Sequence, residues 1–296
     1  MNSSNNPLVS IVIPTYNHAH FLEYALQSVL DQTYTNWEVI IIDNHSQDET
    51  DEVVGRFKNS KVKLLKIHNN GVIAASRNMG VNVAKGEWIA FLDSDDRWAP
   101  NKLQVCLANS NDNVQLIYHD LEIVRDHQDI FQRKNIKSRQ LKNPILIDLL
   151  VNGNVISNSS VVVRKRLLDQ IGDINENPKM IAAEDYNFWL RAAQITNHFY
   201  YIPEILGFYI HHNQGISRKD MSIPSRFACL EFINTLNSEQ KLKMESNLRY
   251  MAGRFAFISG DIRTARKDLL FCLYFGNFFI KIKSIFMLLA SLKTMH

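Results

Sequence analysis

The chain has 296 residues, of which 46% are hydrophobic and 21% are charged, and its formal net charge is +3. This composition is typical of a globular protein, and so small a net charge gives no support to nucleic-acid binding. Three widely spaced cysteines match neither a disulfide framework nor a metal cluster. The first ten residues lack the layout of a signal peptide, and no apolar run reaches the roughly eighteen residues of a membrane span. We therefore expect a cytoplasmic protein.

The first hundred residues alternate between apolar and amphipathic segments. Their patterns predict strands at 8–13, 37–43, 61–67 and 86–93, with helices between them at 21–32, 46–57 and 72–84. Apolar strands that alternate with helices indicate an α/β fold with a parallel sheet covered on both faces. Ligands of such sheets bind beyond the carboxyl ends of the strands.

The remainder of the chain is less regular. Helices are predicted at 101–111 and 184–195, a strand region at 115–126, a mobile polar loop at 126–143, and a strand followed by a helix across 157–172. From residue 222 onward the sequence predicts mostly helix, because turn-forming residues become scarce there.

Three carboxylates follow the fourth predicted strand, in the stretch WIAFLDSDDRW. Asp93, Asp95 and Asp96 fall within four positions, and like charges at a rigid strand end cost free energy unless a cation binds. Carboxylates separated by one residue can share a Mg²⁺ or Mn²⁺ ion, which prefers oxygen ligands and leaves positions open for phosphate. A solvated turn with a helix-capping aspartate is the alternative, and the buried strand before the cluster favours the site. Dinucleotide-binding, P-loop and HExxH patterns are absent from the sequence.

Four blocks of sequence together resemble the family 2 glycosyltransferases. They occur in the family's order and at its spacing: LVSIVIPTYN, EVIIIDNHSQDET, NNGVIAASRNMGVNVAKGEWIAFLDSDD and EDYNFWLR. The resemblance covers about residues 7–215. It implies a GT-A fold, with a mostly parallel sheet flanked by helices, and an inverting transfer of a sugar from a nucleoside-diphosphate donor, which we expect to be a UDP-sugar.

The resemblance assigns the nucleotide-binding residues. The base and ribose would be held by the turn after the first strand and by the acid that ends the second, which are Pro14, Thr15, Tyr16, Asn17 and Asp43. Asn44 stands where many members have a second Asp or a Gly, so base selectivity could differ here. For Asn17 and Asn44 the alternative is ordinary turn chemistry.

The resemblance also assigns the phosphate and metal residues. Asp93-Ser94-Asp95 matches the family's DxD motif, with Asp95 as the principal ligand of Mn²⁺ or Mg²⁺, Asp93 close to the ribose or the metal, and Asp96 beside them. Arg77 would lie near the nucleotide phosphates, which suit the geometry of a guanidinium. A surface arginine is the alternative.

Two later segments supply the remaining site residues that the resemblance implies. Asp185 matches the last acid of the family's Glu-Asp motif, where it would act as the catalytic base that deprotonates the acceptor hydroxyl. Glu184 would orient the helix or contact the acceptor. His212 aligns with a motif histidine that contacts the diphosphate or the metal, although Ile210 replaces the motif's arginine. A loop histidine without a ligand role is the alternative.

The resemblance divides the chain into a GT-A catalytic domain over residues 1–220 and a helical extension over 221–296. The catalytic domain would have a nucleotide-sugar half at about 1–100 and an acceptor half at about 101–220. In the extension, two apolar runs are separated by Lys281 and Lys283, and residues 263–296 hold six basic side chains against one acid. This pattern suits peripheral contact with the inner face of the cell membrane. Packing on the catalytic domain or on a second subunit is the alternative.

These observations predict a glycosyltransferase of bacterial surface polysaccharide synthesis. Its acceptor would be a hydroxyl of a glycan or of a lipid-linked glycan. Two other hypotheses are a degenerate GT-A domain that acts as a scaffold, which the retained acids disfavour, and a sugar nucleotidyltransferase, which would need an N-terminal Gly-rich loop that PTYNHAH does not provide.

Overall fold

A computed structural model describes residues 6–57, 60–125, 134–212 and 219–293. The chain divides into two compact units. The sheet unit comprises Met1–Leu141, Val155–Glu176 and Ile195–Gln214, and the helical unit comprises Lys142–Asn154, Asn177–Gln194 and Gly215–His296. The units interleave along the chain, whereas the expected boundary at residue 220 follows chain order. That functional division remains a prediction.

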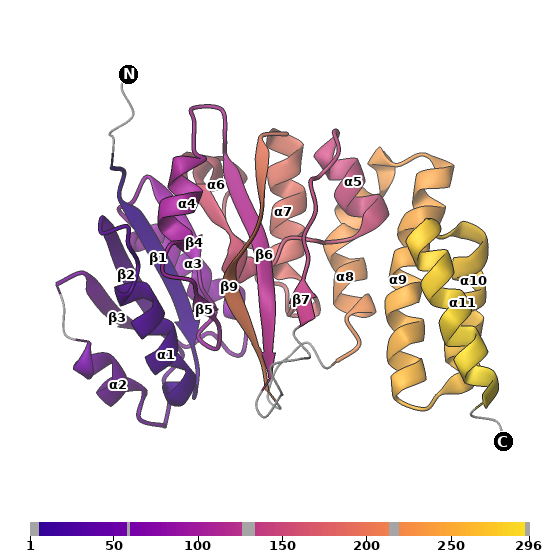
Figure 1. Cartoon of the computed structure of the whole chain (residues 1–296), viewed down its shortest axis with the longest axis horizontal. Helices are drawn as coiled ribbons and strands as arrows, with labels where there is room; N and C mark the ends of the chain where they lie inside the picture. The colour runs from indigo at the N-terminus through magenta and orange to yellow at the C-terminus, as the bar shows by residue number, and fades with distance from the viewer. Residues whose placement is uncertain (1–5, 58–59, 126–133, 213–218, 294–296) are drawn as a thin grey trace. The chain divides into compact units, whose positions relative to one another are not determined.

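The sheet unit contains a mixed sheet that is nine-stranded over the described residues, in the order β3-β2-β1-β4-β8-β6-β9-β5 with β7 beside β6 (Figure 1). The strands are β1 (Val9–Thr15), β2 (Trp37–Asp43), β3 (Val62–Lys66), β4 (Trp88–Phe91), β5 (Arg97–Trp98), β6 (Leu116–Arg125), β7 (Lys134–Ile136), β8 (Val162–Arg164) and β9 (Phe199–His211).

The first four strands are parallel, as the sequence predicts. The remaining strands change the character of the sheet, because β8 runs antiparallel to both β4 and β6 while β9 runs parallel to β6. A mostly parallel sheet therefore describes the first half only. Part of the predicted loop at 126–143 lies outside the described residues, and β7 lies within the rest of it. The sequence pattern does not predict β9, because the burial of this strand does not alternate and because it includes Pro203.

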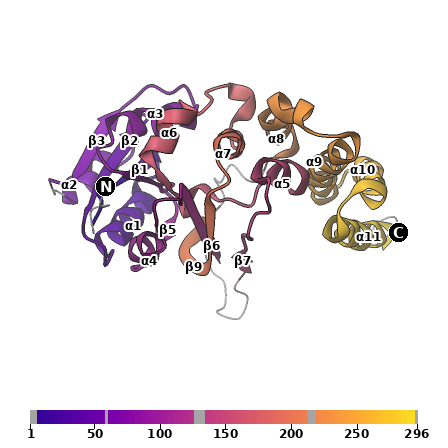
Figure 2. The same ribbon diagram turned by 90° about the horizontal axis from the view of Figure 1, so that it is seen from above.

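Helices cover both faces of the sheet (Figure 2). The helices α1 (Ala19–Leu30) and α4 (Lys102–Ala108) lie on one face, and α3 (Ile73–Val83) and α6 (Lys165–Ile171) lie on the other. The short helix α2 (Thr50–Arg56) packs beside α1, and a 3₁₀ turn, η2 (Asn158–Ser160), precedes β8. On the α1 face, alternate residues of β1, including Ile11 and Ile13, join Leu22 and Leu26 of α1 in a fully buried core.

On the opposite face, Gly80 lets α3 approach β1 closely. A Cβ atom at this position would overlap Cγ1 of Val12, which lies in the middle of β1. Both residues are buried. The absence of a side chain at Gly80 therefore sets how near α3, and the side chains that it carries, can lie to the carboxyl end of the sheet.

The helical unit consists of α5 (Ile145–Asn152), η3 (Pro178–Met180), α7 (Glu184–Ile195), α8 (Ser222–Cys229), η5 (Leu230–Thr235), α9 (Ser238–Ile258), α10 (Ile262–Phe275) and α11 (Phe278–Lys293). The bounds of α7 are those predicted. Its side chains tie the unit together, since the Tyr186 hydroxyl donates to the Leu149 carbonyl (2.8 Å) and the Asn187 amide donates to the Ala228 carbonyl (3.0 Å). Among the described residues, none of the helices has the length and apolar character needed to cross a membrane.

The Gly80 contact generates a stability prediction. Gly80→Ala should lower the free energy of unfolding by about 1–3 kcal/mol, because the added methyl group overpacks the interface between α3 and β1. Gly55→Ala in α2 is the matched control, since a Cβ there would meet no described atom within 4 Å, and helix propensity should raise stability by up to about 1 kcal/mol. Urea unfolding of both variants makes the comparison, and equal effects would contradict the packing described.

Candidate active site

The carboxyl end of β1 projects beyond the neighbouring strand β4. The pairing of these strands ends at Val12 and Phe91, and the Leu92 N–H donates to the Val12 carbonyl (3.1 Å). Alternate residues of a strand direct their backbone polar groups to the same side. The backbone nitrogen of Pro14 therefore faces the β4 side at a point past the end of β4. The N–H group that proline lacks would have no strand partner there, so no hydrogen bond of the sheet is lost. This divergence opens the edge of the sheet at the residues predicted to form the site.

The loops after β1 and β2 are held together by short polar contacts. The Asn17 N–H donates to Ser46 Oγ (2.8 Å), and Asn17 Oδ1 accepts from the Gln47 N–H (2.8 Å). Tyr16 beside them is 51% exposed, and the buried Thr15 hydroxyl has no hydrogen-bond partner among the described residues. Tyr16 and Thr15 thus offer a ring and a polar atom to a ligand, while Asn17 shapes the loop.

Asp43 and Asn44 also organise these loops. Asp43 is fully buried, and its carboxylate accepts from Lys66 Nζ (2.6 Å) and from the Ser46 N–H (3.1 Å). The Asn44 side chain accepts from the Asn69 N–H (2.9 Å), which links the chain after β2 to the chain after β3. The turn chemistry considered for Asn17 and Asn44 is therefore present, and nucleotide contacts by Asp43 and Asn44 remain a prediction.

Backbone strain gathers in the same loops. Asn17, His45 and Asn70 have positive φ angles of 51°, 54° and 51°, and each follows one of the first three strands. Such conformations are uncommon for residues other than glycine and cluster at ligand sites. The stacked rings of His45 and His68, with centroids 3.8 Å apart, lie in these loops as well.

Each member of the acid cluster has a different set of partners. Asp93 accepts from the Arg77 guanidinium (2.7 Å) and from the Asn158 amide (3.1 Å), and Asp95 contacts Nε2 of His212 (2.8 Å). The side chains of Asp93 and Asp95 are 30% and 23% exposed, so both reach the surface. The structure thus brings Arg77 and His212, which lie 16 and 117 positions away from their partners in the sequence, against Asp93 and Asp95.

Asp96 points into the protein instead. Its Oδ1 accepts from the Ile210 N–H of β9 (3.2 Å), and only 3% of the residue is exposed. Burial raises the pKa of Asp96 well above its ordinary value, and the negative charges of Asp95 and Asp93 contribute in the same direction. Its predicted role as a metal ligand has no support from this position. The ion pair of Arg77 with Asp93 and the burial of Asp96 together explain how three neighbouring carboxyl groups can occupy this turn.

His18 belongs to the cluster, and the sequence analysis missed it. Its Nδ1 lies 3.0 Å from Oγ of Ser94, and its ring contacts the His212 ring edge-on, with centroids 5.8 Å apart. The His18 side chain does not cap α1. Asp48, from the loop after β2, does so instead by accepting from the Ala19 N–H (2.8 Å). Burial lowers the pKa of the His18 imidazole, and the nearby negative charge of Asp95 partly offsets this shift.

The 3₁₀ turn η2 supplies further contacts that were not predicted. Besides the Asn158 contact, the Asp93 N–H donates to Ser159 Oγ (3.1 Å). The sequence signal for this turn is the polar run SNSS before a β-branched strand. The signal for His18 is that a histidine occurs in the turn after β1. Neither motif identifies its distant partner from sequence alone.

Glu184 and Asp185 begin α7 in the helical unit. Glu184 is buried, whereas Asp185 is half-buried and its Oδ1 accepts from the Tyr186 N–H (2.6 Å). Ala182, two residues before the helix, has a φ of 74°. The roles predicted for Glu184 and Asp185 are proposals, taken up below.

Two carboxylates fit a divalent cation at this site. Asp93 and Asp95 are adjacent, partly exposed oxygen donors, as Mg²⁺ and Mn²⁺ prefer, and such ions commonly take one or two protein carboxylates together with substrate phosphates. Throughout the described ranges there is no group of three or more His, Cys, Asp or Glu residues that could hold a metal ion.

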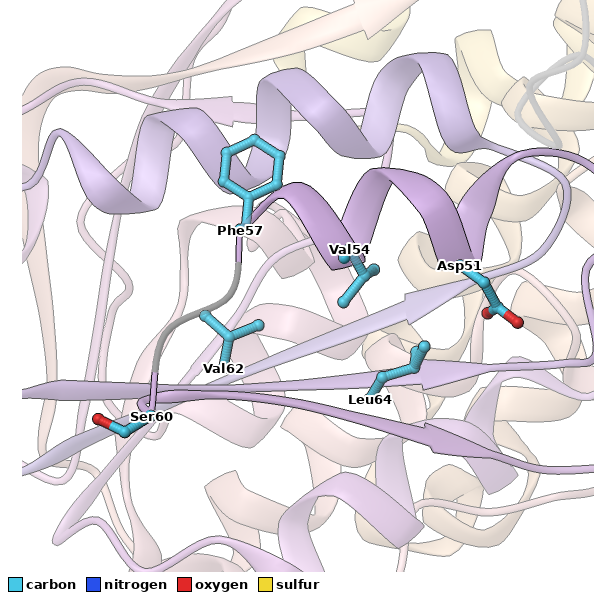
Figure 3. A pocket seen from close by; sticks show the side chains of 7 residues that line it. Asp51, Val54, Phe57, Ser60, Val62 and Leu64 are labelled. Carbon is cyan, nitrogen blue, oxygen red and sulfur yellow. The ribbon is translucent and has the colours of Figure 1, made fainter.

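The pocket in Figure 3 lies between α2 and β3, away from the acid cluster. It has a volume of about 490 Å³ and is lined by Asp51, Val54, Gly55, Phe57, Ser60, Val62 and Leu64. None of the predicted site residues contributes to it. A second pocket of about 350 Å³, lined by Tyr24, Arg97, Phe208 and their neighbours, contains none of them either.

Comparisons with known proteins identify the class. The family described as Glycosyl transferase family 2 matches residues 10–172. The chain belongs to this family, and it is a glycosyltransferase. The predictions of the family and of a GT-A fold are confirmed.

Individual relatives extend the comparison. The chain is 32% identical over 191 residues to WfgD of Escherichia coli, "UDP-Glc:alpha-D-GlcNAc-diphosphoundecaprenol beta-1,3-glucosyltransferase", covering 64% of this chain and 71% of that one. For several other curated relatives the chain spans less than two thirds of their length.

Solved structures share the fold. TarS of S. aureus, in complex with UDP-GlcNAc, has a TM-score of 0.65 at 21% identity, over 90% of this chain and 81% of that one. The mannosyltransferase PcManGT of Pyrobaculum calidifontis, in complex with GDP-Man and Mn²⁺, has a TM-score of 0.65 at 17% identity, over 99% of this chain and 81% of that one.

The contact of His18 with Ser94 yields a prediction about positioning. His18→Ala should lower kcat/KM for sugar transfer by about 3–30-fold, because a loop that holds Asp95 loses one hydrogen bond of about 0.5–2 kcal/mol. His18→Asn, which keeps a polar group, should recover part of the loss. His20→Ala is the control, since His20 is exposed and contacts only the rings of Phe21 and Tyr24 among the interactions described. Equal losses in His18→Ala and His20→Ala would contradict the assignment.

Proposed function

We propose that this glycosyltransferase moves a sugar from a UDP-sugar to a hydroxyl of a glycan or lipid-linked glycan, with inversion, during synthesis of a bacterial cell-surface polysaccharide. One observation carries the proposal. At the carboxyl edge of the parallel strands, two partly exposed carboxylates, Asp93 and Asp95, lie beside the cationic Arg77 and the imidazole of His212. This set of charges suits a diphosphate together with its metal ion.

The donor would lie along the loops after β1, β2 and β4. Tyr16 and Thr15 offer an exposed ring and an unpartnered hydroxyl to the nucleoside, while the loops shaped by Asn17, Asp43 and Asn44 enclose it. The UDP-GlcNAc bound to TarS and the UDP-Glc in the name of WfgD support a UDP-sugar. PcManGT binds GDP-Man instead, so the base must be measured directly.

Asp95 and Asp93 would hold the divalent cation, as expected from the sequence. A bound Mn²⁺ or Mg²⁺ neutralises charge that develops on the leaving diphosphate, and PcManGT was solved with Mn²⁺. Within the chain, Arg77 holds Asp93 in place, and His212 and His18 hold the segment that carries Asp95. The protein thereby orients the ligands before the donor arrives.

Asp185 would be the catalytic base. Its carboxylate removes the proton of the acceptor hydroxyl while that oxygen forms a bond to the anomeric carbon, and the bond from this carbon to the nucleoside diphosphate breaks on the opposite side. A single displacement inverts the anomeric configuration and needs one base, in contrast to glycosidases, which use two carboxylates. The position of Asp185 in the first turn of α7 favours its negative charge, and Glu184 would brace that turn from its buried position.

The acceptor is inferred from relatives. WfgD is named for a GlcNAc-diphosphoundecaprenol acceptor, a glycan on a lipid carrier, and other relatives are named for colanic and teichuronic acid biosynthesis. We therefore propose that the chain acts as a peripheral protein at the cytoplasmic face of the cell membrane.

Asp185→Asn separates binding from chemistry. The variant should bind UDP with unchanged affinity and lose transfer by about 10²–10⁴-fold, because an amide cannot accept the acceptor's proton. Release of UDP from UDP-glucose, with a short-chain GlcNAc-diphospholipid as the acceptor, measures the transfer. Asp112→Asn, at an exposed acid outside the site, controls for the loss of one charge. Normal turnover by Asp185→Asn would falsify the assignment of the base.

A further inference from the structure

One face of α11 keeps large apolar side chains exposed. At 3.6 residues per turn, positions 278, 285, 289 and 292 follow one line along the helix, and 279 and 286 lie beside it. Phe278 and Phe279 are each 71% exposed and Phe286 is 68% exposed, and the other three exceed 45%. We call this set the apolar stripe: Phe278, Phe279, Ile285, Phe286, Leu289 and Leu292.

The rotation of α11 about its axis is set by contacts on its other face. Ser284 and Ser291 are fully buried, and Arg266 of α10 donates to both the hydroxyl (2.9 Å) and the carbonyl (3.1 Å) of Ser291. At the start of the helix, the Asn277 amide donates to Oδ1 of Asn152 in α5 (3.1 Å). The apolar stripe is therefore held outward, while Ile280, Met287 and Leu288 pack inward beside the two serines.

Two further exposed aromatic side chains, Tyr274 and Phe275, lie in the last turn of α10, just before α11. Tyr274 is 75% exposed and Phe275 is 38% exposed, and they precede Phe278 and Phe279 by four residues. The two helices lie side by side (Figure 1). Exposed aromatic residues gathered in this way are characteristic of proteins that enter the interfacial layer of a bilayer.

The charged residues of α11 have one sign. At about 100° per residue, Lys281 lies on one border of the stripe and Lys283 on the other, and α11 contains no Asp or Glu. An anionic surface complements this pattern. Two copies of the chain, packed stripe to stripe, would instead bring these lysines toward one another, which costs free energy.

We propose that the apolar stripe and the aromatic turn beside it lie in the headgroup region of an anionic phospholipid bilayer, with Lys281 and Lys283 against the lipid phosphates. The helix would lie along the membrane plane, because its charges and length do not allow it to cross. This inference deepens the proposed function. It rests on that function only because a lipid-linked acceptor would be the reason for the chain to contact a membrane. It names the surface that makes the contact.

Vesicle flotation of the full chain, without donor or acceptor, tests the proposal. Wild type should bind phosphatidylcholine vesicles that contain phosphatidylglycerol, and Phe286→Glu should weaken this binding by about tenfold or more, because a charge enters the buried side of the interface. Ile223→Glu is the matched control: Ile223, in α8, is 59% exposed but lies outside the apolar stripe. It should bind as wild type does.

Charge is tested separately. The double variant Lys281→Glu, Lys283→Glu should lose most of the preference for phosphatidylglycerol, a reduction of roughly 30-fold, and added salt should weaken wild-type binding. The proposal is overturned if wild type does not float with anionic vesicles. It is equally overturned if Phe286→Glu and Ile223→Glu behave alike, or if sedimentation equilibrium shows a dimer that Phe286→Glu dissociates. Lack of sugar transfer, by contrast, would count only against the proposed function.

Discussion

The ion pair between Arg77 and Asp93 is the interaction on which the candidate site depends. The Arg77 side chain is 4% exposed, so its charge is almost entirely removed from water, and Asp93 is the carboxylate that compensates it at 2.7 Å. Removing one partner of such a pair typically costs about 3–5 kcal/mol. The pair also lowers the repulsion within the acid cluster, which allows Asp95 to remain at the surface beside it. The proposed cation site thus includes one acid whose charge the protein already neutralises.

The fold places this pair through two local features. Gly80 lets α3 approach β1, so that Arg77, one turn earlier on the helix, reaches the end of β4. The early end of β4 and the imino nitrogen of Pro14 leave the edge of the sheet open there. The loops after β1 and β2 then enclose the opening through contacts among Asn17, Asp43 and Ser46. Residues from α3 and from the chain after β1, β2 and β4 meet at one edge of the sheet for these reasons.

Much of this arrangement follows from sequence patterns. Strands with apolar runs and helices with clear periodicity, such as β2 and α7, have the predicted bounds within a residue, because local pattern and tertiary burial agree there. The long strand β9 could not be predicted in this way, because a bulged strand lacks regular alternation. The contacts of His18, Asn158 and Ser159 could not be predicted either, because they join residues 65 to 76 positions apart. The inward direction of Asp96 was likewise hidden, since it depends on the β9 backbone.

We propose above that the acid cluster binds a nucleoside diphosphate through a divalent cation. The most direct measurement is a calorimetric titration of UDP into the full chain with Mn²⁺ and again with EDTA, with GDP, CDP and dTDP as comparisons. We expect that UDP binds with Mn²⁺, that EDTA abolishes most of the heat, and that Asp95→Ala behaves with Mn²⁺ as wild type does with EDTA. Binding of UDP that is equally tight with EDTA, or that survives Asp95→Ala unchanged, would contradict it.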